Sequence, residues 1–257
     1  MEINLTAPQS WKELSPKQLI YISWLMCRGN LTEKEFHTYA FVRLTGIKVL
    51  NKVDDTWHCK YKKNHFTLSA EQVLSFSGQF TWLTQSIGEV TPLPELKKIA
   101  HQDVRLRKLP LEQYLACENY YQAYLFTKKE EFLNKLIASF YLGDEEFNDG
   151  YTAERAELFE KLSFHIRHTV FLWFYGLKSV FQKQFPNFFQ KVESTFDEKP
   201  QAPNMLTQIN NMIRMLNGGD ITKTETIYKI DTWEALAELD AKARENKELE
   251  RRMKKLK

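Results

Sequence analysis

The densest run of apolar and aromatic positions in the chain lies between Phe164 and Phe189. Within it, Val170 to Tyr175 is an unbroken series of six large apolar residues. This series is far shorter than the ~20 apolar residues that span a bilayer, so it predicts a helix buried inside a protein. Proline cannot continue a helix, so Pro186 predicts an end near Phe185. We therefore expect a mainly α protein, a multi-helix bundle around one buried helix at about 152–185.

Capping boxes mark where further helices begin. In such a box a Ser or Thr and a Glu or Gln three residues later satisfy two backbone N–H groups reciprocally. Apolar positions at helical spacing or a short helical turn follow each match. In the first two helices the spacing predicts that Trp24 and Tyr39 face inward. The five matches, which favour a mainly α protein, are Ser15/Gln18, Thr32/Glu35, Ser69/Gln72, Thr127/Glu130 and Thr222/Glu225.

The helical spacing of apolar residues is interrupted between the capping boxes at Thr32/Glu35 and Ser69/Gln72. Short β-prone runs at 47–50 and 56–61 flank a polar stretch, and a third run lies at 66–68. This arrangement predicts a small β hairpin or a three-stranded flap near 47–68. The basic segment 95–108 is predicted to be partly helical.

An extended helix is predicted at the C-terminal end, from Thr232 to about Lys254, with Asp231 as its cap. Its apolar stripe fades halfway along, and the remainder is almost wholly charged. A helix that is polar all round extends into solvent or binds a partner. A solvated tail is one interpretation of this helix. The functional interpretation is an arm that anchors to another protein through Trp233, Leu236 and Leu239.

Three consecutive parts follow from these patterns. We expect an N-terminal helical part with the β flap at 1–92, a helical core at 93–200 and a C-terminal helical arm at 201–257.

Composition narrows the class of protein. Of the 257 residues 43% are apolar, which is enough for a substantial core, while nine Gly and eight Pro argue against a sandwich or barrel. Three widely spaced cysteines without a CxxC pair indicate a reduced intracellular compartment. The N-terminus has neither the basic nor the apolar region of a secretory signal, and no segment predicts a membrane span.

Candidate chemistry is sparse. His58, Cys59 and His65 are too few for a closed metal site, and the first two point to opposite faces of a strand. His165 and His168 share a helix face but lack a second Glu-x-x-His helix, so packed histidines are favoured over a metal site. The Gly218-Gly219-Asp220 turn is interpreted as a helix stop and a cap. We expect no catalytic residue, metal or cofactor.

One basic cluster offers an alternative site for nucleic acid. A net charge of only +3 gives no general warrant for such a partner, and an exposed helix face or loop is the usual meaning of a local basic run. Nucleic acid is therefore a disfavoured partner. The cluster contains Lys97, Lys98, Arg105, Arg107 and Lys108, together with His101.

Four segments resemble a group of tailed-phage and prophage proteins encoded among virion-assembly genes. They are Ser10–Met26, Glu130–Leu142, Val170–Phe189 and Ile209–Glu245. The last is similar to the ends of phage tail-assembly chaperones, in which a GD-containing turn precedes a helix. The resemblance implies other phage structural or tail proteins as partners, no catalytic residue, and a location in the bacterial host cytoplasm or in the virion.

The expected function is therefore non-enzymatic: phage morphogenesis through protein–protein contacts, in tail assembly and chaperone-like. A structural virion component, such as a connector or tail-completion protein, is the first alternative. A DNA-binding regulator that uses the basic cluster is the second.

Overall fold

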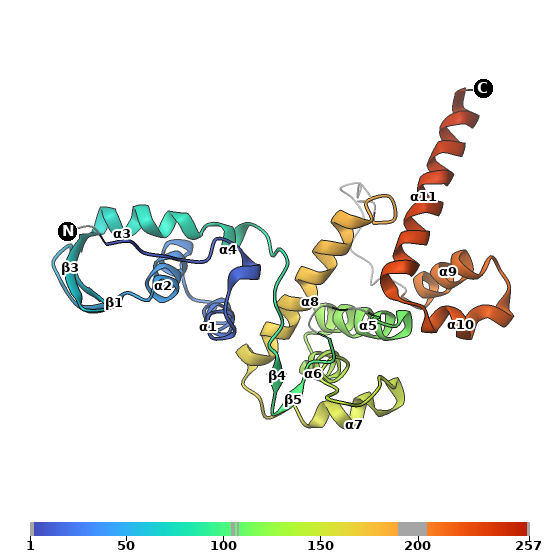
Figure 1. The fold of residues 1–257 in the computed structure, drawn as a ribbon, viewed down its shortest axis with the longest axis horizontal. Helices are drawn as coiled ribbons and strands as arrows, with labels where there is room; N and C mark the ends of the chain where they lie inside the picture. Colours follow the sequence, from blue (N-terminus) through green and yellow to red (C-terminus); the bar gives the residue numbers. More distant parts are fainter. Residues whose placement is uncertain (1–2, 104–105, 107, 190–204, 256–257) are drawn as a thin grey trace. The chain divides into compact units, whose positions relative to one another are not determined.

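A computed structural model describes residues 3–103, 106, 108–189 and 205–255. The described chain is mainly helical, with small antiparallel sheets and a long C-terminal helix, which confirms the predicted fold class (Figure 1). It divides into two compact units. The first contains Met1–Leu93 and Leu162–Leu177, and the second contains Pro94–Lys161 and Lys178–Lys257. These units are not consecutive in sequence, unlike the three parts expected at 1–92, 93–200 and 201–257.

The first unit combines helices with the predicted flap, which is a three-stranded antiparallel sheet in the order β1-β2-β3. A bulge interrupts the pairing of β1 with β2 between Val49 and Asn51. The beginning of α8 also belongs to this unit. The elements are α1 (Pro16–Met26), α2 (Glu33–Thr45), β1 (Lys48–Val53), β2 (Thr56–Tyr61), β3 (Asn64–Ser69), α3 (Ala70–Ser77), α4 (Trp82–Gln85) and α8 (Phe164–Gln184).

Three of the five predicted capping boxes are present, at Ser15, Thr32 and Ser69. The box at Thr127 is wrong, because the Thr127 hydroxyl donates to the Ala123 carbonyl within the preceding helix, at 2.7 Å. The box at Thr222 is also wrong, because that residue lies inside a 3-10 turn that Asp220 caps. A sequence match cannot tell a cap from a hydroxyl that bonds back to its own helix.

The core of the first unit joins residues that are far apart in sequence. Trp11 meets Trp82 edge-on at 5.8 Å, and its ring N–H donates to the Ser86 carbonyl at 3.0 Å. In α8, Gly176 lies against residues 88–90, where an added Cβ would stand 2.3 Å from the Gly88 carbonyl oxygen. Only a residue without a side chain allows this approach.

The second unit begins with a hairpin, and the partly helical segment predicted at 95–108 is therefore wrong. Lys97 and Lys98 have φ of 49° and 67°, the left-handed values of a two-residue hairpin turn. The elements are β4 (Glu95–Leu96), β5 (Ile99–Ala100), α5 (Leu111–Thr127), α6 (Glu130–Ala138), α7 (Thr152–Glu157), α9 (Met205–Asn217), α10 (Thr224–Lys229) and α11 (Thr232–Lys255), with the end of α8.

The buried helix is shorter than predicted. Helix α7 ends at Glu157 and α8 starts at Phe164, so the expected single helix from about 152 is two helices. The predicted end near Phe185 is confirmed, since α8 ends at Gln184. Asp240 of α11 lies at this end, where its carboxylate accepts the backbone N–H groups of Asn187 and Phe188 at 2.7 and 3.0 Å.

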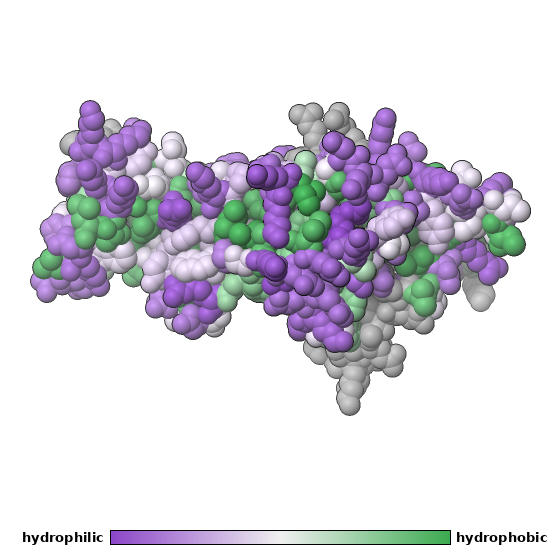
Figure 2. Space-filling model, turned by 90° about the horizontal axis from the view of Figure 1, so that it is seen from below, coloured by the Kyte–Doolittle hydropathy of each residue, from purple (hydrophilic) through white to green (hydrophobic). Residues whose placement is uncertain are grey.

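Within the described ranges, no helix combines the length and the apolar character that crossing a bilayer requires. At the left end of Figure 2, where the sheet of the first unit lies, hydrophilic residues surround the hydrophobic ones.

Candidate partner-binding site

A groove in the second unit has a volume of about 590 Å³. Its walls come from α5, the 147–149 loop, α9 and α10. The lining combines apolar side chains with a polar rim that holds two carboxylates and no ammonium or guanidinium group. The apolar lining consists of Leu115, Ala116, Phe147, Leu206, Ile209 and Tyr228, and the polar rim of Glu112, Asn119, Asn148, Asp149 and Asn210.

Helix α9 forms one wall because its apolar residues recur at helical spacing. Ile213 turns into the unit and is buried, and Ile209 is half-buried at the groove. Leu206, one turn further toward the N-terminus, keeps 74% of its surface exposed at the lip. The apolar stripe of α9 therefore continues from the core of the unit into solvent.

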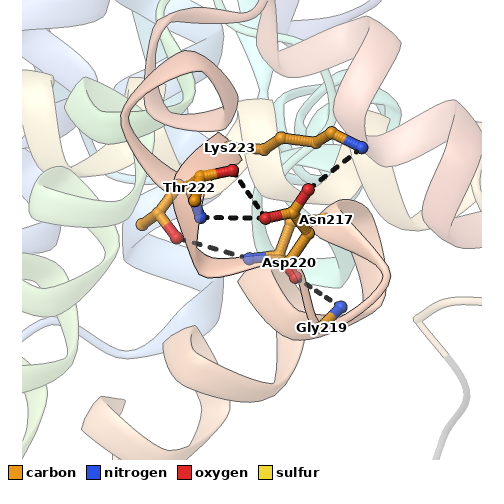
Figure 3. Close-up of polar contacts among 6 residues, drawn as sticks. Asn217, Gly219, Asp220, Thr222 and Lys223 are labelled. Carbon is orange, nitrogen blue, oxygen red and sulfur yellow. Dashed lines mark hydrogen bonds and ion pairs between the residues drawn. The ribbon is translucent and has the colours of Figure 1, made fainter.

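Polar contacts hold the turn after α9 (Figure 3). This turn leads into α10, which contributes Tyr228 to the groove. Gly218 and Gly219 have φ of 63° and 86°, and the Gly219 N–H donates to the Asn217 side-chain oxygen at 2.9 Å. Asp220 accepts the Thr222 N–H and hydroxyl at 3.0 and 2.6 Å. These bonds hold the pKa of the Asp220 carboxyl below its usual value. The helix stop and cap predicted for this turn are confirmed.

Backbone contacts fix the start of α11 to the start of α5. The Thr232 N–H and hydroxyl both donate to the Leu109 carbonyl, at 2.8 and 2.7 Å. The Asp231 side chain accepts the Trp233 N–H at 2.8 Å, so the predicted cap at Asp231 is confirmed. Lys242 of α11 also donates to the Met215 carbonyl at 2.5 Å, which supports the last turn of α9. The groove wall is thus built on α5 and α11.

The predicted anchor of Trp233, Leu236 and Leu239 lies inside the second unit. Leu236 and Leu239 are completely buried. The Trp233 ring meets Phe181 edge-on at 4.7 Å and donates to the Leu106 carbonyl at 3.3 Å. The chain's own residues cover this stripe, so the three side chains act as core here and the expectation that they anchor a partner is corrected.

The charged part of α11 is exposed to solvent. Figure 1 shows that α11 extends beyond α9 and α10. Almost every described residue from Arg244 to Lys255 is exposed, including Leu249 at 53% and Met253 at 58%. Lys247 is the half-buried exception and lies 3.5 Å from the Asn187 side-chain oxygen. The arm therefore exists, but its apolar anchor points are few.

The predicted basic cluster is only partly assembled. Lys97 and Lys98 are exposed in the β4–β5 turn, and Lys108 is exposed before α5. Arg105 and Arg107 lie outside the described residues. His101 is buried and stacks on Phe140 at 5.7 Å, and burial lowers its pKa to about 4. The imidazole is thus neutral at pH 7 and adds no charge to the cluster.

The histidines of α8 are part of the packing between α1 and α8. The Ser23 hydroxyl donates a hydrogen bond to the His165 carbonyl oxygen at 2.6 Å. The Ser23 Oγ also lies 3.0 Å from the His168 Nδ1. Because the hydroxyl has a single hydrogen, the Nδ1–H of His168 is the donor in this second bond. Burial lowers the pKa of His168 to about 4. Among the described residues, no three His, Cys, Asp or Glu side chains lie in an arrangement that could hold a metal ion.

Sequence reasoning missed the groove although one of its walls was readable. The apolar residues of α9 recur at helical spacing along the whole helix, but only its second half turns into the unit. The α5 wall lies about 90 positions earlier in the chain and the 147–149 loop about 60 positions earlier, and no local pattern links them to α9. Comparison with protein-family models, curated proteins and solved structures finds no match to this chain.

Proposed function

We propose that this protein is a non-enzymatic phage morphogenesis protein that works in tail assembly, as a chaperone that binds another polypeptide. The setting rests on the resemblance to virion-assembly proteins in the four segments described above. The binding role rests on one observation, the groove between α5 and α9 with Leu206 exposed at its lip. We place its action in the cytoplasm of the infected host.

The occupant we propose is an amphipathic helix of a tail protein. Helices bind grooves by placing residues at i, i+3, i+4 and i+7 on an apolar floor, and Leu115 and Ile209 supply such a floor, with Leu206 at its lip. The rim carries Glu112 and Asp149, so lysines or arginines beside the apolar stripe of the helix would be attracted. A tape-measure helix with that pattern would be kept from aggregating while it is held.

Leu206→Asp tests the groove. The side chain is 74% exposed, so its replacement costs the fold little, while a carboxylate at the lip opposes an apolar occupant. We expect the dissociation constant for the tail-protein helix to rise about tenfold, which corresponds to a loss of about 1.4 kcal/mol of binding free energy. Co-expression with the tail proteins of the same phage identifies the helix, and fluorescence anisotropy with the labelled helix measures its affinity.

The matched control is Leu249→Asp, the same change on an exposed leucine of α11 away from the groove. It should leave the affinity unchanged. Equal binding by the wild type and by Leu206→Asp would remove the groove from the proposal.

The first alternative, a structural virion component, differs from a chaperone in whether the protein is present in the mature particle. A chaperone leaves before the particle is complete, whereas a connector or tail-completion protein stays. Quantitative mass spectrometry of purified particles separates the two. Stoichiometric amounts of the chain in mature virions would favour the structural component.

A further inference from the structure

The three-stranded sheet of the first unit carries a row of basic side chains on one face. Lys60 of β2 lies directly opposite Lys48 of β1 on one side and His65 of β3 on the other. Residues that are directly opposite in antiparallel strands project from the same face of a sheet. Two ammonium groups and one imidazole therefore stand side by side across all three strands.

Two more lysines lie beside this row, and no carboxylate balances it. Lys62 and Lys63 form the turn between β2 and β3, two and three residues after Lys60, and the Lys62 ammonium lies at the end of the sheet over the Tyr61 ring, 5.2 Å from its centroid. The nearest acids in sequence, Asp54 and Asp55, form the β1–β2 turn at the opposite end of the sheet. Throughout the described chain none of these four lysines forms an ion pair.

Protection of a sheet edge does not explain the row. Lysines on an edge strand prevent pairing with another chain, and Lys48 and Lys52 on β1 can serve that purpose. Lys60 lies on the central strand, which is paired on both sides, so it guards no edge. Like charges directly opposite one another destabilise a sheet. Sequences tolerate such a locally unfavourable arrangement mainly where the residues involved serve a function.

Most of the remaining positions on this face are polar. The next row consists of Asn51, His58 and Thr67, all of which can donate hydrogen bonds. The opposite face carries Trp57, Cys59 and Leu68, of which Cys59 and Leu68 are buried. Val53, beside Thr56 and Ser69 at the far end of the cationic face, is the apolar exception and is 51% exposed. One aliphatic side chain does not make the anchored centre of a protein contact or a membrane surface. Clustered ammonium groups with neutral donors beside them match phosphate oxygens.

We infer that this cationic face, formed by Lys48, Lys60, Lys62, Lys63 and His65, binds the phosphate backbone of nucleic acid without regard to sequence. It lies in the first unit, whereas the groove of the proposed function lies in the second. It also differs from the Lys97–Lys108 cluster. A tail-assembly protein with this face would hold its protein partner and nucleic acid through separate surfaces.

Fluorescence anisotropy with labelled 30-mers tests the inference, using duplex DNA, single-stranded DNA and single-stranded RNA over 50 to 200 mM KCl. Four neutralised phosphates give a slope of about −3.6 in log K against log salt on duplex DNA, which is a loss of roughly 150-fold across this range. Lys48→Gln with Lys60→Gln should reduce the slope by about 1.8, and all four substitutions should bring it near zero.

The control is Lys17→Gln with Lys34→Gln, two exposed lysines on α1 and α2 of the same unit, and it should keep the wild-type slope. Circular dichroism confirms that each variant is folded. Absence of binding to all three 30-mers at 50 mM KCl would overturn the inference, as would equal slopes for control and sheet variants. Binding to phosphatidylserine vesicles but not to the 30-mers would overturn it too.

Binding of the tail-protein helix provides an independent readout. The four-lysine variant should bind that helix like the wild type, so failure at the sheet and failure at the groove remain distinguishable.

Discussion

Single residues decide how closely α8 packs in the first unit. Alanine is favoured over glycine inside a helix by about 1 kcal/mol, yet Gly176 lies in the middle of α8. A Cβ there would stand 2.3 Å from the Gly88 carbonyl oxygen and 3.1 Å from the Val90 Cγ2. The first contact is with backbone, which cannot rotate away. The close approach therefore outweighs helix propensity at this position.

We expect Gly176→Ala to lower the free energy of unfolding by roughly 1–3 kcal/mol, the usual cost of overpacking a buried site. Urea denaturation monitored by circular dichroism measures it. Gly78→Ala is the matched control, because a Cβ at Gly78 meets nothing within 4 Å and its φ is −58°. The control should be neutral or stabilising, and a neutral Gly176→Ala would show that residues 88–90 move aside.

Elements were easier to predict than their surroundings. The three-stranded flap, the C-terminal helix and its cap at Asp231 followed from local patterns, because turn and capping chemistry acts over a few residues. Local patterns do not predict which surface an apolar stripe packs against. The stripe of α11 looks the same in sequence whether Phe181 or another protein covers it. The groove escaped prediction for the same reason, since its walls meet only in the folded unit.

Truncation of α11 at two points separates its core half from its solvent half. Deletion of 244–257 removes almost only exposed residues, so the free energy of unfolding should change by about 0.5 kcal/mol or less. Deletion of 232–257 removes Leu236 and Leu239 from the core, at roughly 2–5 kcal/mol each, and should unfold the second unit. Thermal unfolding monitored by circular dichroism distinguishes these outcomes.

The shorter truncation also tests the arm as a binding element. Since we place the tail-protein helix in the groove, the variant without 244–257 should bind it like the full chain. Loss of binding on this deletion would transfer the site to the charged end of α11.

At the scale of the whole molecule, each unit contains a histidine whose pKa is strongly lowered, the half-buried His168 in the first and the buried His101 in the second, and burial also lowers the pKa of His37 in the first unit. Burial lowers the pKa of His168 and His101 from the ordinary 6.5 to about 4. The folded state thus binds these protons less readily than the unfolded chain. Their stabilising effect is complete above pH 6.5 and is lost as the pH falls from 6.5 toward 4.

We expect both units to lose stability on acidification through that window, by up to about 1.4 kcal/mol per pH unit for each histidine. Urea denaturation at pH 7, 6, 5 and 4.5 measures the trend. His168→Gln should weaken the dependence for the first unit, where His37 still contributes, while that of the second persists. A free energy of unfolding that stays constant from pH 7 to 4.5 would mean that neither imidazole is kept neutral by folding.

The discontinuous first unit has a consequence for synthesis on the ribosome. Its first 93 residues cannot enclose their core until the beginning of α8 has been made, because Ser23 and residues 88–90 pack against that helix. At about 5–20 residues per second, the 84 residues between Leu93 and Leu177 delay this closure by roughly 4–17 s. For that interval the nascent chain exposes the surface that α8 later covers, and slower translation would lengthen its exposure.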